Sequence, residues 1–452
     1  MDKIVHLEKD KIPKLLARYS IPAIAGMVVQ ALYNITDRVF VGHSIGIDGI
    51  SALTAYFPIM LMFMAFGMLF GIGGSSAFSI ALGEKNNAKA EKIIAGTFSL
   101  LVITIFTLSI LGQIFAPKIL SLFGASENIM KLSLDYGRII LGGAVINSAA
   151  HAMNNFVRAQ GSPKTAMFSM IAGGAANIVL DYIFIFIFGW GVKGAAIATV
   201  LSQAVSAFIV FSYLLGKRSF IKIRPKNFIA EFDILQRIIS IGLAPFFMQV
   251  AASLINAFIN RQLQKYGGDN ALSIIGMIFS FTQILFLPVV GINQGSMPII
   301  GYNYGAKKFE RVIHTTYVAI AAATFIMTVG FIITRIFPEQ ILLAFGKHKK
   351  EILDQGTFAI KFFFLMTPTI GFQIVASGLF QAIGKSILAI IMSLSRQLLF
   401  LIPFTYIFPL FFGLNGIWFA VATADALAVI VTGTFFIREI MILKKQEKAN
   451  QS

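Results

Sequence analysis

The sequence contains no cysteine, and only 13% of its 452 residues are charged. Without cysteine the chain can form no disulfide, thiol nucleophile or zinc–thiolate site. An ordinary soluble domain has about 25% charged residues, so a soluble protein of this length would lack the polar surface that it needs. Apolar residues are abundant instead: 57% of the chain is hydrophobic, and the mean hydropathy is +0.81. This composition predicts an integral membrane protein.

The net charge of +17 fits a membrane protein better than a nucleic-acid binder. The basic residues gather in tails and short loops between apolar runs, as the positive-inside rule describes, and they form no soluble basic face with interleaved aromatics. We therefore expect no nucleic-acid partner. The stretch 1–20 carries five basic and three acidic residues and lacks the features of a cleaved signal peptide. The first span should act as an uncleaved anchor.

Twelve apolar runs are long enough to cross a bilayer, which takes about 20 residues. The runs are 14–41, 52–82, 93–115, 130–158, 164–188, 193–215, 237–264, 272–300, 312–336, 351–382, 386–411 and 415–440. The sequence therefore predicts an all-α polytopic membrane protein. We expect a first lobe over 1–216, a cytoplasmic linker over 217–236 and a second lobe over 237–452. The linker is the only long polar connection, and it should form a short interfacial helix or a draped loop.

The basic residues also predict the orientation in the membrane. They precede the first span, follow the second and eighth spans, flank the turn after the fourth, and continue through the linker and the tail. All of these fall on one side if both termini are cytoplasmic. Only the loop around Lys347, Lys349 and Lys350 breaks the pattern. We expect a multi-pass protein of the inner (plasma) membrane with both termini in the cytoplasm.

The two halves of the chain resemble each other at a nearly constant spacing. Pro22, Asp37 and Arg38 correspond to Pro245, Asn260 and Arg261 in the second half. The sequence KILSLFG corresponds to QILLAFG, and GVKGAAIA corresponds to GLNGIWFA. Three landmarks at one period indicate a duplication. Six spans return the chain to the same side, so the repeats are parallel, an arrangement found in transporters whose pathway lies between the repeats.

Two carboxylates lie inside predicted spans, where an ionisable group costs about 2.5–3.5 kcal/mol and is a functional candidate by default. Asp37 lies in the first span and Asp181 in the fifth. At about 1.5 Å per helical residue, both reach the outer half of the membrane, and Thr199 reaches a similar depth. Asn177 lies one turn before Asp181 on the same face. These four groups form a predicted site that coordinates a cation such as Na⁺ or holds a proton.

Each acid also has a purely structural interpretation. Asp37 could be a solvated carboxylate paired with Arg38 at the membrane surface, and Asp181 a polar contact between helices. Pro22, inside the first span, permits a bend because it removes a backbone hydrogen bond. The second half keeps this proline but has Asn260 and Pro403 where acids would correspond, so we expect ion coupling in the first lobe only.

The motifs YNITDRVFVG and NIVLDYIFIF, together with GVKGAAIAT and GLNGIWFAV, resemble those of the MATE (multidrug and toxic compound extrusion) family, in its prokaryotic DinF/MepA-type branch. The resemblance covers nearly the whole chain. It implies twelve helices in two six-helix bundles that form a V and open alternately to either side. It also implies export of lipophilic cationic compounds in exchange for H⁺ or Na⁺, and therefore a role in drug resistance.

Carried over by position, the resemblance assigns the cation site to Asp37, Asn177, Asp181 and Thr199. It assigns the bend in the first helix to Pro22. It further implies that Gln30, Asn154 and Met170 line the substrate pocket. We expect membrane lipid around the chain, no cofactor beyond the transported ion, and a monomer.

Two other function classes remain as alternatives. A lipid-linked oligosaccharide flippase of the same superfamily would have a basic, water-filled cavity, but the spans hold few basic residues, chiefly Arg138, Arg261 and Arg396. A membrane enzyme would need a nucleophile–base set or metal-ligand spacing, and the sequence has neither. Arg396 and Asp425 should form a structural ion pair in the second lobe.

Overall fold

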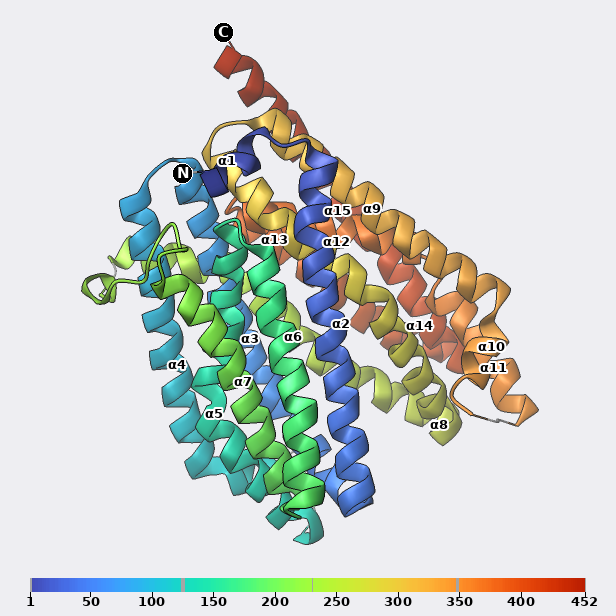
Figure 1. Cartoon of the computed structure of the whole chain (residues 1–452). Helices are drawn as coiled ribbons and strands as arrows, with labels where there is room; N and C mark the ends of the chain where they lie inside the picture. The colour runs from blue at the N-terminus through green and yellow to red at the C-terminus, as the bar shows by residue number, and fades with distance from the viewer. Residues whose placement is uncertain (1, 123–126, 230, 347–348, 452) are drawn as a thin grey trace. The chain divides into compact units, whose positions relative to one another are not determined.

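The computed structural model of the chain is built from helices (Figure 1). It describes residues 2–122, 127–229, 231–346 and 349–451, and no strand occurs within these ranges. A helix satisfies its own backbone hydrogen bonds, and lipid offers no alternative partner. Long apolar runs such as these therefore become helices. The chain divides into two compact units, the first formed by Met1–Asp10 and Ile21–Phe246 and the second by Lys11–Ser20 and Phe247–Ser452.

The helices of the first half follow one another through short turns. They are α1 (Asp2–Lys9), α2 (Ile12–Ile45), α3 (Ile47–Gly83), α4 (Asn87–Leu122), α5 (Glu127–Ala159), α6 (Pro163–Asp181), the π-helix η1 (Tyr182–Ile187) and α7 (Gly191–Leu215). Two helices start with residues that suit a helix start or a turn. Pro163 is the first residue of α6, where its fixed φ fits the first helical turn. Gly191 is the first residue of α7 and has a φ of 55°, which glycine adopts at little cost.

The helices of the second half include one very long element and several short ones. They are α8 (Phe232–Gly305), α9 (Phe309–Ile336), α10 (Pro338–Leu343), α11 (Lys350–Phe363), α12 (Thr367–Ala382), α13 (Ser386–Leu394), the π-helix η3 (Ser395–Leu401), α14 (Ile402–Phe412) and α15 (Leu414–Gln451). The helix α8 contains a break at Gly268, whose φ of 59° and ψ of −154° are not helical. A conformation with positive φ is accessible to glycine at little cost.

All twelve predicted spans are helical, apart from a turn at 364–366 within the tenth span and the last residue of the fifth. Nine helices among the described residues are individually long and apolar enough to cross a membrane, and the pair α11 and α12, bent by 44°, makes a tenth. The remaining two have physical explanations. The break at Gly268 divides α8 into two predicted spans, and α5 carries charges such as Asp135 and Arg138 that lower its hydropathy. With 33 residues, α5 is still about 50 Å long at 1.5 Å per residue.

The described residues of the predicted linker form a loop up to the start of α8, and its last residues, 232–236, belong to that helix. Between α7 and α8 the only helical turn among the described residues is the 3-10 helix η2 (Pro225–Asn227). The buried side chain of Gln160, at the end of α5, holds the start of this loop. Its carbonyl oxygen accepts hydrogen bonds from the backbone N–H groups of Phe220 and Ile221, each 2.9 Å long, and its amide donates to the Ile221 carbonyl oxygen at 3.0 Å. The loop is therefore fixed to the first unit.

Glycine permits backbone-to-backbone packing inside the first unit. A Cβ atom at Gly73 of α3 would collide with the carbonyl oxygen of Ile238 in the first turns of α8, and one at Gly242 would collide with the carbonyl oxygen of Leu69. At Gly67, two turns earlier on α3, a Cβ would meet nothing within 4 Å. Small residues such as Gly73 and Gly242 let membrane helices approach closely and gain van der Waals contact.

This packing predicts different outcomes for two alanine substitutions on the same helix. We expect Gly73→Ala to destabilise the protein by about 1–3 kcal/mol, the usual cost of overpacking, because backbone atoms cannot move aside. Gly67→Ala serves as the matched control and should be neutral or slightly stabilising, since alanine is the better helix former. Thermal unfolding of the purified protein, followed by circular dichroism, measures both. Equal melting temperatures for the two variants would contradict the packing argument.

Candidate functional cation site

The helices α2 and α6 bring Asp37 and Asp181 together. Gly26 of α2 lies against the side chain of Met170 on α6, and further along both helices Val29 and Tyr33 lie against Gly174. The two helices therefore run in the same direction. Asp37 and Asp181 lie the same number of residues beyond the first contact, which makes them level with each other. The two carboxylates are close enough to interact electrostatically.

The helix α7 adds Thr199 at the same level. It packs antiparallel to α6 (Figure 1), with Gly173 against Ser206 at one end of the contact and Gly194 against the backbone of Phe184 at the other. Thr199 lies between these two contacts along α7, as Asn177 and Asp181 do along α6. The structure thus places the four predicted ligands on three neighbouring helices of one unit.

The polar groups of this site are buried and largely unpartnered. Asp181 and Asn177 are 0% exposed, Thr199 is 7% exposed and Asp37 is 9% exposed. Among the described residues, no hydrogen-bond partner reaches either oxygen of Asp181, either polar atom of the Asn177 side chain, or Oδ1 of Asp37. Buried polar atoms without partners are rare in native proteins and require an explanation. A bound cation or proton would supply one.

The chemistry of these groups suits a small hard cation. Carboxylate, amide and hydroxyl oxygens are the ligands that such ions prefer. Transition-metal sites usually contain a group of His, Cys, Asp or Glu side chains. The described residues contain no group of three or more such side chains that could hold a metal ion. Two carboxylates with two neutral oxygens can instead bind a monovalent ion that is later released, or share a proton.

Arg38 does not form an ion pair with Asp37 within the described chain. Its guanidinium group lies 5.7 Å from the centre of the Phe57 ring, while the Asp37 side chain is buried. Cation–π contact of this kind satisfies an arginine near a membrane surface.

A π-helical turn follows Asp181 directly. The α-helical part of α6 ends at Asp181, and η1 continues as a π-helix over Tyr182–Ile187. π-Helical turns are rare and frequently lie at functional sites. Here the wider turn begins next to the buried acid. Nothing in the apolar sequence YIFIFI distinguishes it from an ordinary α-helix, so sequence reasoning missed it.

Two tyrosines near the acids were also missed. Tyr33 and Tyr136 each interact electrostatically with both Asp37 and Asp181. Tyr136, on α5, is 3% exposed and packs edge-to-face on Tyr56, with 5.6 Å between the ring centres. Tyr33 lies one turn before Asp37, and its spacing along the helix could have identified it. Tyr136 is distant in sequence, and only the fold brings it to the site.

The three predicted pocket residues occupy different environments. The amide of Gln30 lies 3.0 Å from Nε2 of His151. Asn154 is 5% exposed, and its amide donates to the carbonyl oxygen of Ala166 and to Oγ of Ser169. Met170 packs against Gly26. All three thus lie at contacts between α2, α5 and α6, and their role as pocket residues stays a prediction.

Pro22 lies beside the point where α2 passes from one compact unit to the other. The residues Lys11–Ser20 belong to the second unit, and the helix from Ile21 onward belongs to the first. The helix α8 has the same arrangement, because it leaves the first unit after Phe246, next to Pro245. Proline weakens a helix by removing one hydrogen bond. Both repeats thus carry a weak point at a boundary between units.

The second unit has no comparable acid pair at the corresponding positions. Asn260 is exposed, and Pro403 opens α14. The buried carboxylate of Asp425, 1% exposed, accepts a hydrogen bond from Nε of Arg396 in a salt bridge, which confirms the predicted pair. Its charge is thereby neutralised. The unneutralised acids are a feature of the first unit.

The fold and this site define a multi-pass membrane transporter. The MatE family model matches the chain twice, over residues 22–183 and 245–407, and the chain belongs to the MatE family. It is therefore a secondary transporter and not an enzyme. The two matches also start and end at corresponding points of the repeats. The sequence-based identification of the family and of a twelve-helix transporter fold is confirmed.

Known relatives match over nearly the whole chain. The multidrug export protein MepA of Staphylococcus haemolyticus is 27% identical over 425 residues, which cover 94% of this chain and 93% of that protein. A crystal structure of MATE in the bent conformation superposes with a TM-score of 0.93 at 27% identity, covering 99% of each chain. An outward-facing multidrug resistance MATE family transporter of the MOP superfamily gives 0.91 at 28% identity, covering 97% of this chain and 98% of that one.

The geometry predicts that cation binding depends on the unpartnered acids. Asp37→Asn and Asp181→Asn should each weaken binding of Na⁺ or H⁺ about ten- to hundredfold, the usual effect of losing one charged partner. Stabilisation of the purified protein against heat by NaCl, relative to choline chloride, measures Na⁺ binding, and proton uptake after an acid pulse measures H⁺ binding. Asp135→Asn is the matched control, because this acid of α5 already pairs with Nζ of Lys193 at 3.5 Å. A control variant as impaired as the other two would refute the assignment.

Proposed function

We propose that the chain exports lipophilic cationic compounds in exchange for H⁺ or Na⁺, by alternating access across the plasma membrane. The observation that carries this proposal is the pair of buried, unpartnered carboxylates Asp37 and Asp181. The similarity to a multidrug export protein supports the substrate class. The coupling site consists of these two acids with Asn177 and Thr199.

Coupling requires that the ion bind the two conformations of the transporter differently, since a ligand shifts an equilibrium only by its differential affinity. Two desolvated carboxylates provide this difference. Unoccupied, they repel each other and favour an arrangement of α2 in which water reaches them. Occupied by a cation or proton, they allow α2 and α6 to stay close. The bend in α2 at Pro22 converts this local change into opening of the transporter.

The lobes are residues 1–216 and 237–452, and the linker 217–236 joins them. Both termini face the cytoplasm, in agreement with the distribution of basic residues. Gln30, Asn154 and Met170 contribute to the surface that contacts the substrate. The chain works as a monomer in contact with membrane lipid, and it needs no cofactor.

Drug efflux from cells tests the proposal. Cells that express the protein should accumulate less ethidium than cells without it, and Asp37→Asn or Asp181→Asn should abolish the difference because neither variant can couple efflux to an ion gradient. Asp135→Asn should retain efflux. Purified protein in liposomes, given first a pH gradient alone and then a Na⁺ gradient alone, identifies the ion. Unimpaired efflux by both acid variants would refute the coupling site.

The two prolines predict a second contrast. Pro22→Ala should lower the rate of efflux about tenfold or more and change its dependence on ion concentration, because α2 carries both the bend and a coupling acid. Pro245→Ala should slow transport without changing the ion dependence, because α8 carries no such acid. Initial rates in liposomes, measured at several ion concentrations, separate the two effects. The same shift in ion dependence for both variants would contradict the proposed role of Pro22.

A further inference from the structure

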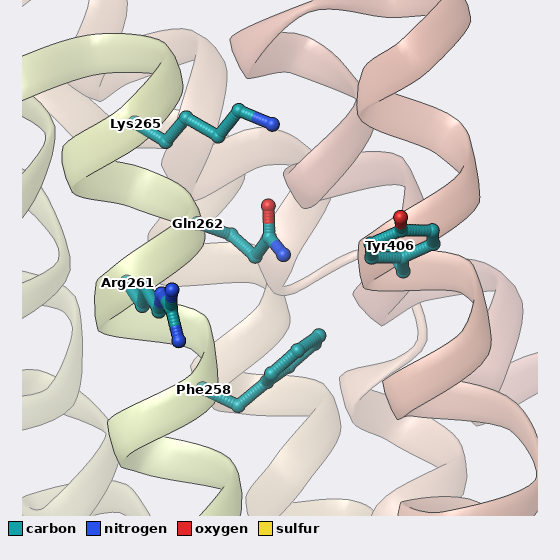
Figure 2. A pocket seen from close by; sticks show the side chains of 5 residues that line it. All are labelled: Phe258, Arg261, Gln262, Lys265 and Tyr406. Carbon is teal, nitrogen blue, oxygen red and sulfur yellow. The ribbon is translucent and has the colours of Figure 1, made fainter.

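The second unit contains a cavity of about 440 Å³ at the end of the first segment of α8. Figure 2 shows its lining, which comes from four residues of α8 and one of α14. The residues are Phe258, Arg261, Gln262, Lys265 and Tyr406. All five belong to the compact unit that starts at Phe247. The volume lies within the range of about 300–1,000 Å³ that is usual for small-molecule sites.

The charge of this cavity is positive. Arg261 and Lys265 lie four residues apart, so they occupy one face of α8 on successive turns. Neither forms an ion pair with a carboxylate in the part of the chain that the structure describes. Asp269 follows the break at Gly268, and its Oδ1 already accepts a hydrogen bond from Gln264 at 3.2 Å.

The other lining groups suit an organic anion with an apolar body. Gln262 is 9% exposed. Its side-chain amide can donate a hydrogen bond to an acidic oxygen of a ligand. Phe258 lies about one turn before Arg261 and two turns before Lys265 on α8, and Tyr406 lies across from Gln262 on α14 (Figure 2). Beyond Tyr406 the surface of α14 is strongly apolar, with Leu410 62% and Phe411 75% exposed.

We propose that this cavity is a binding site for amphipathic organic anions. A phosphate or carboxylate head lies at Arg261 and Lys265, and an apolar body lies along Phe258, Tyr406 and the exposed face of α14. The ligand is either a soluble amphiphile or an anionic lipid, since both present this chemistry. The site is separate from the acids of the first unit and does not depend on their role.

Binding of octyl phosphate to the full-length protein in amphipol, followed by calorimetry, tests the site. We expect saturable binding that weakens about tenfold in Arg261→Gln and about tenfold in Lys265→Gln, because each substitution removes a charged hydrogen bond. Arg261→Lys should keep most of the affinity. Octyltrimethylammonium, with the same chain and the opposite charge, should bind at least tenfold more weakly. Arg335→Gln is the matched control, because this arginine of the same unit lies over the Phe331 ring, away from the cavity.

A second experiment distinguishes an anionic lipid from a soluble amphiphile as the ligand. Phosphatidylglycerol is added to phosphatidylcholine nanodiscs, and the lipid that stays with the protein is counted by native mass spectrometry. Loss of retained phosphatidylglycerol in the double variant assigns the site to a lipid headgroup, and loss of octyl phosphate binding alone assigns it to a soluble amphiphile. Unchanged affinity of the double variant for both probes, or equal affinity of the wild-type protein for octyltrimethylammonium, overturns the proposal. Asp37→Asn should leave octyl phosphate binding intact, which separates this test from that of the coupling site.

Discussion

The burial of two carboxylates without partners is the constraint on which the first unit depends. Each costs about 2.5–3.5 kcal/mol within a span, and placing two together adds repulsion. No arginine or lysine of the described chain forms a salt bridge with either acid. Glycine at positions 26, 173 and 174 instead lets α2, α6 and α7 approach closely, which holds the acids within electrostatic range. Among the described residues, the packing of the unit thus leaves both oxygens of Asp181, the side-chain amide of Asn177 and Oδ1 of Asp37 without hydrogen-bond partners.

Sequence reasoning found the spans and the acids because both depend on local signals. A span is a run of apolar residues, and a carboxylate interrupts such a run visibly. The helical rise alone predicts a similar depth for Asp37, Asp181 and Thr199, and their depth in the membrane stays a prediction.

The missed features depend on information that the local sequence does not hold. Tyr136 reaches the acids only because α5 packs beside the helices that carry them, and no spacing within the chain predicts that contact. The π-helix after Asp181 arises in a run of aromatic and β-branched residues that is equally compatible with an α-helix. Tertiary packing decides these points.

The two units differ in their charged side chains but share the positions of some prolines and glycines. Both repeats keep a proline beside the point where a helix changes unit, at Pro22 and Pro245, and both keep the glycine-rich start of the last helix. A bend depends on the backbone, so it survives most changes of neighbouring side chains. A charge depends on one side chain, and a single substitution removes it. The position of Asp37 is occupied by Asn260 in the second unit, whereas Arg38 is kept as Arg261. A duplicated scaffold can thus retain both prolines while single substitutions change the charge of each half independently.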